Sequence, residues 1–120
     1  MRIKILVNGD PIPAARPRFA RGRAYQPRRN VEYRGLVQVA AKSAMGGRAP
    51  MTGELSAVVK LYRRFKATAR NYGDLDNFLK GIFDGLAGIC FGDDSQICRC
   101  LVVKFKDSEC PRAEIEIEEI

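Results

Sequence analysis

The 120-residue sequence contains no histidine. Histidine is the side chain that most often changes charge near neutral pH and the commonest nitrogen ligand of metals. Any catalysis in this chain must therefore rely on carboxylates, on lysine or on metal-bound water. No apolar run approaches the ~20 residues that a membrane-spanning helix needs, and Met1-Arg2-Ile3-Lys4-Ile5 alternates in the manner of a strand and not of a signal peptide. We expect a cytoplasmic protein with no membrane partner.

Paired metal-binding cysteines are also missing. The four cysteines, at positions 90, 98, 100 and 110, show no Cys-x-x-Cys spacing, and a zinc site would require all four thiolates to converge. We expect reduced, buried cysteines that act as small apolar residues. No small-molecule cofactor is expected.

Acidic residues are scarce in the first 70 residues, which hold 3 of the 14 Asp and Glu but 16 of the 21 Lys and Arg, a balance of +13. Residues 71–120 hold 5 basic residues against 11 acidic ones, a balance of −6. A basic surface is often only a solvated one. Here, however, one 14-residue stretch contains six arginines, whose planar guanidinium groups bind phosphate bidentately: Arg16, Arg18, Arg21, Arg23, Arg28 and Arg29. The stretch points to a nucleic-acid partner.

Apolar periodicity predicts a single α+β domain over residues 1–120, with a small mixed or antiparallel sheet of about four strands and two helices packed on one face. Residues 10–29 have neither helical nor strand periodicity and read as a long basic loop, with a short hairpin near Phe19 to Tyr25. The expected elements are strands at 3–7, 54–66, 97–105 and around 113–117, and helices from the Asn30 cap to Gly46 and from Phe78 to Gly88.

Two pairs of aspartates stand out in the acidic part of the chain, Asp74 with Asp76 and Asp93 with Asp94. Such clustered charges repel one another unless a cation neutralises them, and a divalent metal suits all-oxygen ligands. The plainer alternatives are a helix cap with a solvated loop residue for the first pair, and a charged turn for the second.

The spacing of the first pair sets a condition on its backbone. Side chains two apart point the same way only in an extended segment, so Asp74 and Asp76 can share a metal only if Asp74-Leu75-Asp76 is extended. Leu75 would then point into the core. The strand that opens at Ile97 could lie beside the strand leading toward Asp74, which would bring the second pair back to the first.

Lys80 lies one helical turn after Asp76. Its plain role is an exposed ion pair with Asp76 or Asp84, worth a few tenths of a kcal/mol. Its functional role would be to stabilise the charge that develops on a scissile phosphate. We treat Asp84, one turn further on, as structural or as the partner of Lys80.

Taken together, these motifs resemble the RusA Holliday junction resolvases of phages and bacteria. The resemblance covers nearly the whole chain and differs from one branch of the family at residues 11–15. It rests on Asp74-Leu75-Asp76-Asn77, Lys80, Phe83-Asp84-Gly85-Leu86 and Asp93-Asp94-Ser95-Gln96-Ile97, with Ala15-Arg16-Pro17-Arg18-Phe19, Tyr25, Pro27 and Tyr33 upstream.

The resemblance implies a homodimer that uses magnesium or manganese to cut four-way DNA junctions by paired nicks. It implies that Asp74, Asp76 and Asp94 are essential metal-binding carboxylates, that Asp93 is a neighbouring acid of the metal site, and that Lys80 is needed for catalysis. The branched DNA would be held by the six arginines of residues 16–29 and by Arg63, Arg64, Lys66 and Arg70, in association with the nucleoid. The alternatives are a non-catalytic nucleic-acid-binding module and a regulatory protein whose basic half binds an acidic partner.

Overall fold

The computed structural model describes residues 1–14, 18–25, 27–64 and 74–120, with the backbone alone described at 18–20, 24 and 25. Within these ranges, six strands, two α-helices and one 3-10 turn follow one another. They are β1 (Arg2–Asn8), β2 (Arg18–Ala20), β3 (Arg23–Tyr25), α1 (Arg28–Met45), β4 (Leu55–Arg63), α2 (Leu75–Leu86), η1 (Asp94–Gln96), β5 (Ile97–Lys106) and β6 (Arg112–Glu119).

Four of the strands form one mixed sheet in the order β1-β6-β4-β5. The β4 and β5 strands run parallel, whereas β6 pairs antiparallel with both β1 and β4. Buried and outward-facing residues alternate along the strands of this sheet. In β6, Ile115 and Ile117 are buried, and the neighbouring Glu114 and Glu116 face outward. Strands β2 and β3 make the separate hairpin that the sequence predicts.

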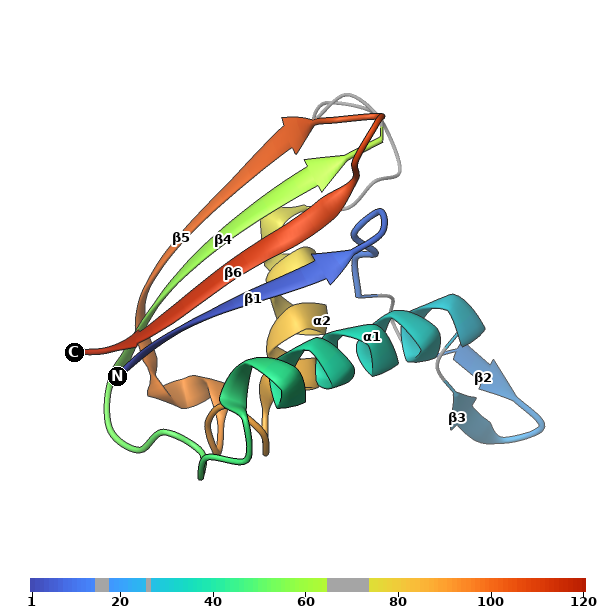
Figure 1. The fold of residues 1–120 in the computed structure, drawn as a ribbon. Helices are drawn as coiled ribbons and strands as arrows, with labels where there is room; N and C mark the ends of the chain where they lie inside the picture. Colours follow the sequence, from blue (N-terminus) through green and yellow to red (C-terminus); the bar gives the residue numbers. More distant parts are fainter. Residues whose placement is uncertain (15–17, 26, 65–73) are drawn as a thin grey trace.

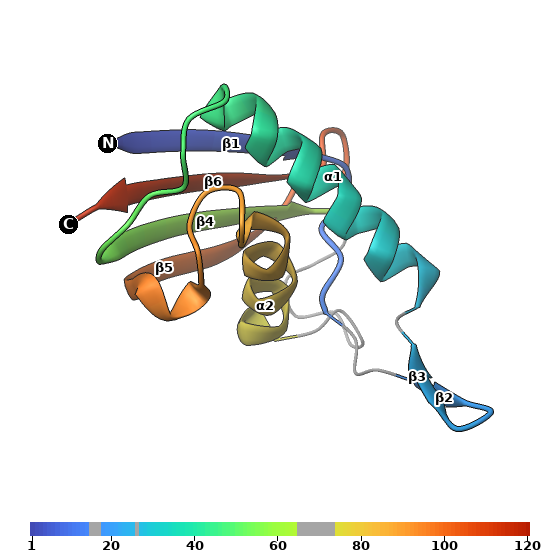
Figure 2. The same cartoon turned by 90° about the horizontal axis from the view of Figure 1, so that it is seen from below.

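Both α-helices cover the same face of the sheet, with α1 along the β1 side and α2 crossing near β4 and β5 (Figures 1 and 2). The predicted α+β architecture is therefore confirmed. The helices meet at Gly85, where an added Cβ would lie 2.7 Å from Cγ1 of Val37, so only glycine permits this crossing. In the described ranges, neither helix is both long and apolar enough to span a bilayer.

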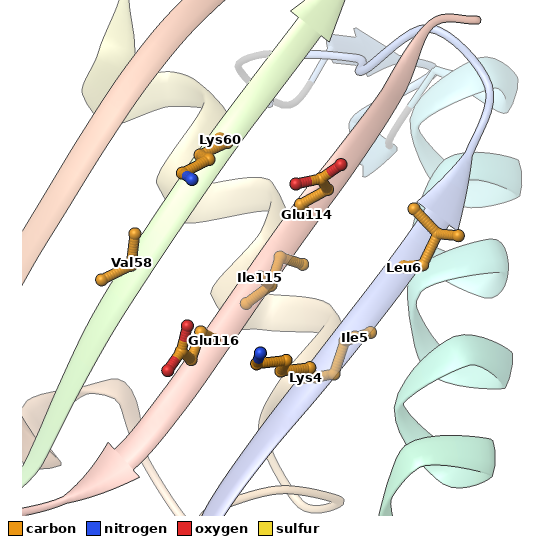
Figure 3. Close-up of a pocket in the computed structure, with 8 residues that line it drawn as sticks. All are labelled: Lys4, Ile5, Leu6, Val58, Lys60, Glu114, Ile115 and Glu116. Atoms are coloured by element: carbon orange, nitrogen blue, oxygen red, sulfur yellow. The ribbon is translucent and has the colours of Figure 1, made fainter.

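The other face of the sheet is covered by no described element. It carries a shallow hollow in which Lys4 stands opposite Glu116 and Lys60 opposite Glu114 on neighbouring strands (Figure 3). Opposite charges on paired strands balance one another. The four charges that line this hollow therefore cancel.

Two boundaries differ from the prediction. The helix α1 begins at Arg28 with Pro27 at its N-cap, and not at an Asn30 cap. Proline has a fixed φ suited to a helix start, and Asn30 instead uses its side-chain amide to donate a 2.7 Å hydrogen bond to the Pro13 carbonyl. Strand β4 runs from Leu55 to Arg63, so the predicted strand is too long at Arg64, and its last two residues, 65 and 66, lie outside the described residues.

The cysteines behave as predicted only in part. Cys90 is buried, and burial raises the pKa of its thiol to about 11. The other three are exposed, because β5 is an edge strand and Cys110 lies in the turn between β5 and β6. The interpretation of all four as core residues is wrong for Cys98, Cys100 and Cys110.

Candidate functional site

The first aspartate pair sits at the N-terminal end of α2. Asp74 is the N-cap, with extended backbone angles of φ −88° and ψ 164°, and the helix begins at Leu75, so Asp76 lies in its first turn. The prediction of an extended tripeptide is therefore wrong. Leu75 is 38% exposed and does not anchor the core, because the apolar face of α2 that packs on the sheet starts only at Phe78.

The helical position nevertheless leaves both carboxylates in solvent, on the surface of one helix end. Asp74 makes no side-chain capping hydrogen bond, and the dipole of the helix favours negative charge in its first turn. Lys80 projects from the next turn with 69% of its side chain exposed, its Nζ 3.7 Å from Oδ2 of Asp84. That is the plain i,i+4 pair, and such an exposed pair holds the lysine only weakly.

The second pair opens the turn that leads into β5. Asp93 is the N-cap of η1, and hydrogen bonding from Ser95 lowers the pKa of its carboxyl. Asp94, the first residue of η1, is exposed.

Gln96 clamps this turn, a role that the sequence analysis missed. Its Oε1 accepts hydrogen bonds from the backbone N–H groups of Gly92 and Asp93, at 2.8 and 3.1 Å. Its Nε2 donates to the carbonyls of Met51 and Gly53, at 3.1 and 3.0 Å. An Asp followed three residues later by Gln has capping-box spacing, so the signal was present in the sequence.

The two aspartate pairs do not meet within one chain. Residues 87–91 close tightly on the C-terminal end of α2, with the Gly88 N–H donating to the Phe91 carbonyl at 2.7 Å. The second pair therefore follows the end of the helix opposite to the first, and a helix of 12 residues is roughly 18 Å long. Figure 1 shows the start of α2 and the turn before β5 at opposite ends of that helix. The prediction that the turn returns the second pair to the first is wrong.

Carboxylate oxygens are suitable ligands for a hard divalent cation. In a single chain, however, the two aspartate pairs lie too far apart to bind the same cation. Across residues 1–14, 18–25, 27–64 and 74–120, no three His, Cys, Asp or Glu side chains come together to hold a metal. One chain by itself therefore does not fit the metal site that the sequence predicts.

The predicted basic loop, residues 10–29, is hydrogen-bonded to the first turns of α2 near its own start. The Ala14 N–H donates a 3.0 Å hydrogen bond to the carbonyl of Asn77, the residue after Asp76. An added Cβ at Gly81 would lie 3.6 Å from the same Ala14 nitrogen, so the segment packs closely on the helix. Through Asn30 and Pro13, the start of α1 is held to the same segment.

Beyond this anchor the hairpin β2–β3 projects away from the sheet and helices (Figure 2). Its turn has Arg21 at φ 51° and Gly22 at φ 73°, and two successive residues with positive φ are typical of the tight type I′ hairpin turn. Arg21 and Arg23 are exposed on the hairpin, and Arg28 and Arg29 are exposed at the start of α1. We call these four residues the arginine arm.

The structure describes the side chains of only some of the other predicted DNA-binding residues. Arg64 is exposed beside the end of β4. Arg18 lies in β2, where only the backbone is described. Arg16, Lys66 and Arg70 lie outside the described residues.

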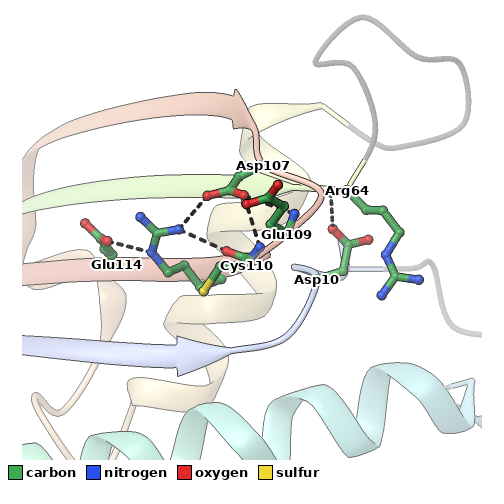
Figure 4. Close-up of polar contacts among 7 residues, drawn as sticks. Asp10, Arg64, Asp107, Glu109, Cys110 and Glu114 are labelled. Atoms are coloured by element: carbon green, nitrogen blue, oxygen red, sulfur yellow. Dashed lines mark hydrogen bonds and ion pairs between the residues drawn. The ribbon is translucent and has the colours of Figure 1, made fainter.

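Arg63 is buried, with 2% of its surface exposed, so its assignment as a DNA contact is wrong. Its Nη2 donates to the Pro11 carbonyl at 3.2 Å and lies 3.8 Å from Oδ2 of Asp10. Its guanidinium stands 4.5 Å from the centre of the Phe78 ring, in the first turns of α2. Asp10 also accepts from the Arg64 backbone N–H at 2.9 Å (Figure 4). Arg63 therefore supports the helix end that carries the first aspartates.

We expect Arg63→Ala to lower the free energy of unfolding by about 2 kcal/mol, because it leaves the Pro11 carbonyl without its hydrogen-bond donor and removes a buried side chain that packs on the Phe78 ring. Urea denaturation measures the change. The matched control is the exposed neighbour, and Arg64→Ala should shift stability by no more than about 0.5 kcal/mol. An Arg63→Ala protein of unchanged stability that binds DNA poorly would return Arg63 to the binding surface.

Two other carboxylates from residues 71–120 form ion pairs with Arg112 of β6. Arg112 bonds Asp107 at 3.0 Å and Glu114 at 2.8 Å, contacts that end at the labelled carboxylates in Figure 4. Its guanidinium lies 3.8 Å from the centre of the Tyr62 ring. Hydrogen bonds from the Cys110 backbone and from Arg112 lower the pKa of Asp107. These groups stabilise the turn between β5 and β6.

Clustered exposed arginines are the electrostatic footprint of a nucleic-acid-binding protein, and the four residues of the arginine arm are exposed. The chain belongs to the family described as Endodeoxyribonuclease RusA, which matches residues 8–118. It is also 30% identical to "Uncharacterized protein YqaN" of Bacillus subtilis (strain 168), over 98% of this chain and 96% of that protein. Membership implies a Holliday junction nuclease that binds branched DNA and needs a divalent metal.

Proposed function

We propose that this protein cuts four-way DNA junctions by magnesium- or manganese-dependent phosphodiester hydrolysis, placing paired symmetric nicks. One observation carries the proposal beyond the family: Asp74, Asp76 and Lys80 are exposed at the start of α2, and Ala14, which precedes the arginine arm in the chain, is hydrogen-bonded to Asn77 in the same turns. DNA held by the arm would thus lie near the carboxylates. Acting on cellular DNA would place the protein in the cytoplasm, at the nucleoid.

The described side chains suggest separate roles. The arginine arm would bind phosphates of the junction, which fixes position without reading sequence. Lys80, which forms an exposed ion pair with Asp84, would turn to offset the negative charge on the scissile phosphate. Although Asp74-Leu75-Asp76 is not extended throughout, Asp74 is an N-cap, whose side chain can reach over the first turn, where Asp76 lies. Asp74 and Asp76, together with Asp94, would hold the divalent cation, which when bound supplies activation of water and stabilisation of the leaving oxygen. Asp93 would orient the turn that carries Asp94.

The separation of the two pairs supports a homodimer as the form that cuts DNA. Because α2 keeps the pairs roughly a helix length apart in one chain, a complete acidic site would need Asp74 and Asp76 from one copy and Asp94 from a second. Two-fold symmetry then creates two equal sites. Two sites match the approximate symmetry of a four-way junction, whose opposing strands must both be cut.

A non-catalytic binding module is the second candidate, and the lack of a three-carboxylate group among the described residues of one chain favours it. It accounts for the arginine arm. It gives no role to four exposed aspartates, which would repel phosphate.

A cleavage assay with a labelled synthetic four-way junction separates the two functions. We expect symmetric nicks in the branched substrate with magnesium, none after EDTA and none in a linear duplex of the same sequence. Binding of the junction without any nick, in magnesium or in manganese, would establish the binding module instead.

A further inference from the structure

Two arginines stand at the tip of the hairpin β2–β3, among the smallest residues. Residues 20–24 read Ala-Arg-Gly-Arg-Ala, so Arg21 and Arg23 are the long side chains of this stretch, and both are exposed. The hairpin projects away from the sheet and from both α-helices (Figure 2). The tip is therefore narrow, and its two guanidinium groups are accessible to a partner outside the fold.

Arg21 occupies a backbone conformation that suits other residues better. Its φ is 51°, and every other positive φ in the described ranges belongs to a glycine. A Cβ in this left-handed region approaches the following carbonyl oxygen, and a tight hairpin turn prefers asparagine, aspartate or glycine there. Strained residues persist mainly at functional sites. The turn by itself therefore does not account for an arginine at this position.

The positive charge of the tip is not balanced within the described part of the chain. No Asp or Glu occurs in the sequence between Asp10 and Glu32. Among the described residues, the side chains of Arg21 and Arg23 have no hydrogen-bond or ion-pair partner, whereas Arg28 pairs with Glu32 at 2.9 Å. Such guanidinium groups on a projecting tip suit a polyanion whose acceptor atoms match the planar group.

We infer that the tip of the hairpin enters the major groove of a DNA arm, where Arg21 donates two hydrogen bonds to O6 and N7 of a guanine. The inference rests on the part of the proposed function in which the arginine arm binds the junction. Three residue pairs and the turn give a ribbon roughly 10 Å long. The major groove, about 12 Å wide and about 8.5 Å deep, admits a two-stranded ribbon, whereas the minor groove is only about 6 Å wide.

Reading a base explains the position of Arg21 better than binding a phosphate does. Phosphates lie on the outside of the duplex, so the exposed Arg28 and Arg29 at the start of α1 can bind them without a projecting tip or an unfavourable φ. The floor of the groove requires both reach and a narrow end. Guanine presents two acceptors there, and bidentate pairing with arginine is the commonest specific contact to a base. Arg21 would thus give the protein a sequence preference, while the other residues of the arginine arm position it on the phosphates.

Junctions with altered guanines test the inference, by gel-shift titration in EDTA so that no cutting occurs. Replacing guanine by 7-deazaguanine removes N7 from the major groove, whereas hypoxanthine keeps O6 and N7 and removes only the amino group in the minor groove. Discrimination by one bidentate pair is roughly 5- to 150-fold. Loss of one of its two bonds should therefore weaken wild-type binding of the 7-deazaguanine junction about 10-fold, and the hypoxanthine junction should bind within about 2-fold of the guanine junction.

Arg21→Gly removes the guanidinium and places at this turn the residue that its φ favours. The variant should bind the guanine and 7-deazaguanine junctions equally, and thermal unfolding at or above the wild-type temperature shows that the fold is kept. The matched control is Arg28→Ala, which removes an exposed arginine at the start of α1. This control should weaken binding of both junctions alike and keep the ratio of about 10-fold between them.

The outcomes separate this inference from the proposed function. Equal wild-type binding of the guanine and 7-deazaguanine junctions overturns the inference, and so does an Arg21→Gly protein that still distinguishes them. Weaker binding of the hypoxanthine junction alone would place the contact in the minor groove and contradict it as well. Cutting of four-way junctions by a wild type that ignores 7-deazaguanine would leave the nuclease intact. Guanine-dependent binding through Arg21 without any cutting would support the groove contact and favour the binding module over the nuclease.

Discussion

Asp76→Asn should abolish junction cutting in magnesium while leaving junction binding unchanged. The substitution keeps the size of the side chain and removes its charge at an exposed position in the first turn of α2. Loss of an outer-shell partner of a metal typically costs 10- to 100-fold, so loss of a direct ligand should lower the cleavage rate by more than about 100-fold. Single-turnover cleavage and a gel-shift titration in EDTA measure the two quantities.

Asp84→Asn is the matched control. Asp84 lies on the same helix, is partly exposed and pairs with Lys80, yet it lies two turns further from the helix end than Asp76. Its replacement should change the cleavage rate only a few-fold, through the freed lysine. Wild-type cutting by Asp76→Asn would remove this residue from the site, and equal losses in both variants would indicate a general effect on α2.

Much of the fold follows from local patterns in the sequence. Alternating isoleucine and glutamate in β6 predicts a strand with one buried face, and the spacing of Phe78, Ile82 and Leu86 predicts the buried stripe of α2. The parallel pairing of β4 and β5 was also predictable, because a helix between two neighbouring strands lets the second strand run in the same direction as the first.

The errors concern long-range packing, which local patterns do not report. Arg63 looks like a surface cation in sequence, but Asp10, which is 53 residues away, and the Phe78 ring give it a buried site. In the sequence, Asp74-Leu75-Asp76 looks extended because helical spacing of apolar residues starts at Phe78. In the structure, the helix begins about one turn before Phe78, with exposed residues that the apolar spacing does not mark. The separation of the aspartate pairs depends on the tight closure of residues 87–91, which only the backbone hydrogen bonds reveal.

The central claim is that each acidic site is shared between two copies of the chain, and mixing two inactive variants tests it most directly. Asp76→Asn and Asp94→Asn should each be inactive alone, because every site in either homodimer lacks one ligand. In a mixed dimer, one shared site loses both ligands and the other recovers both. Random pairing of equal amounts makes about half of the dimers mixed, so about a quarter of the sites are intact.

The two variants are unfolded, combined in equal amounts and refolded with the labelled junction assay as the readout, beside each variant refolded alone. Shared sites predict that the mixture alone regains cleavage, as single nicks in place of paired ones, because each mixed dimer has one working site. A mixture as inactive as its two components, in a sample shown to contain mixed dimers, would contradict the shared site.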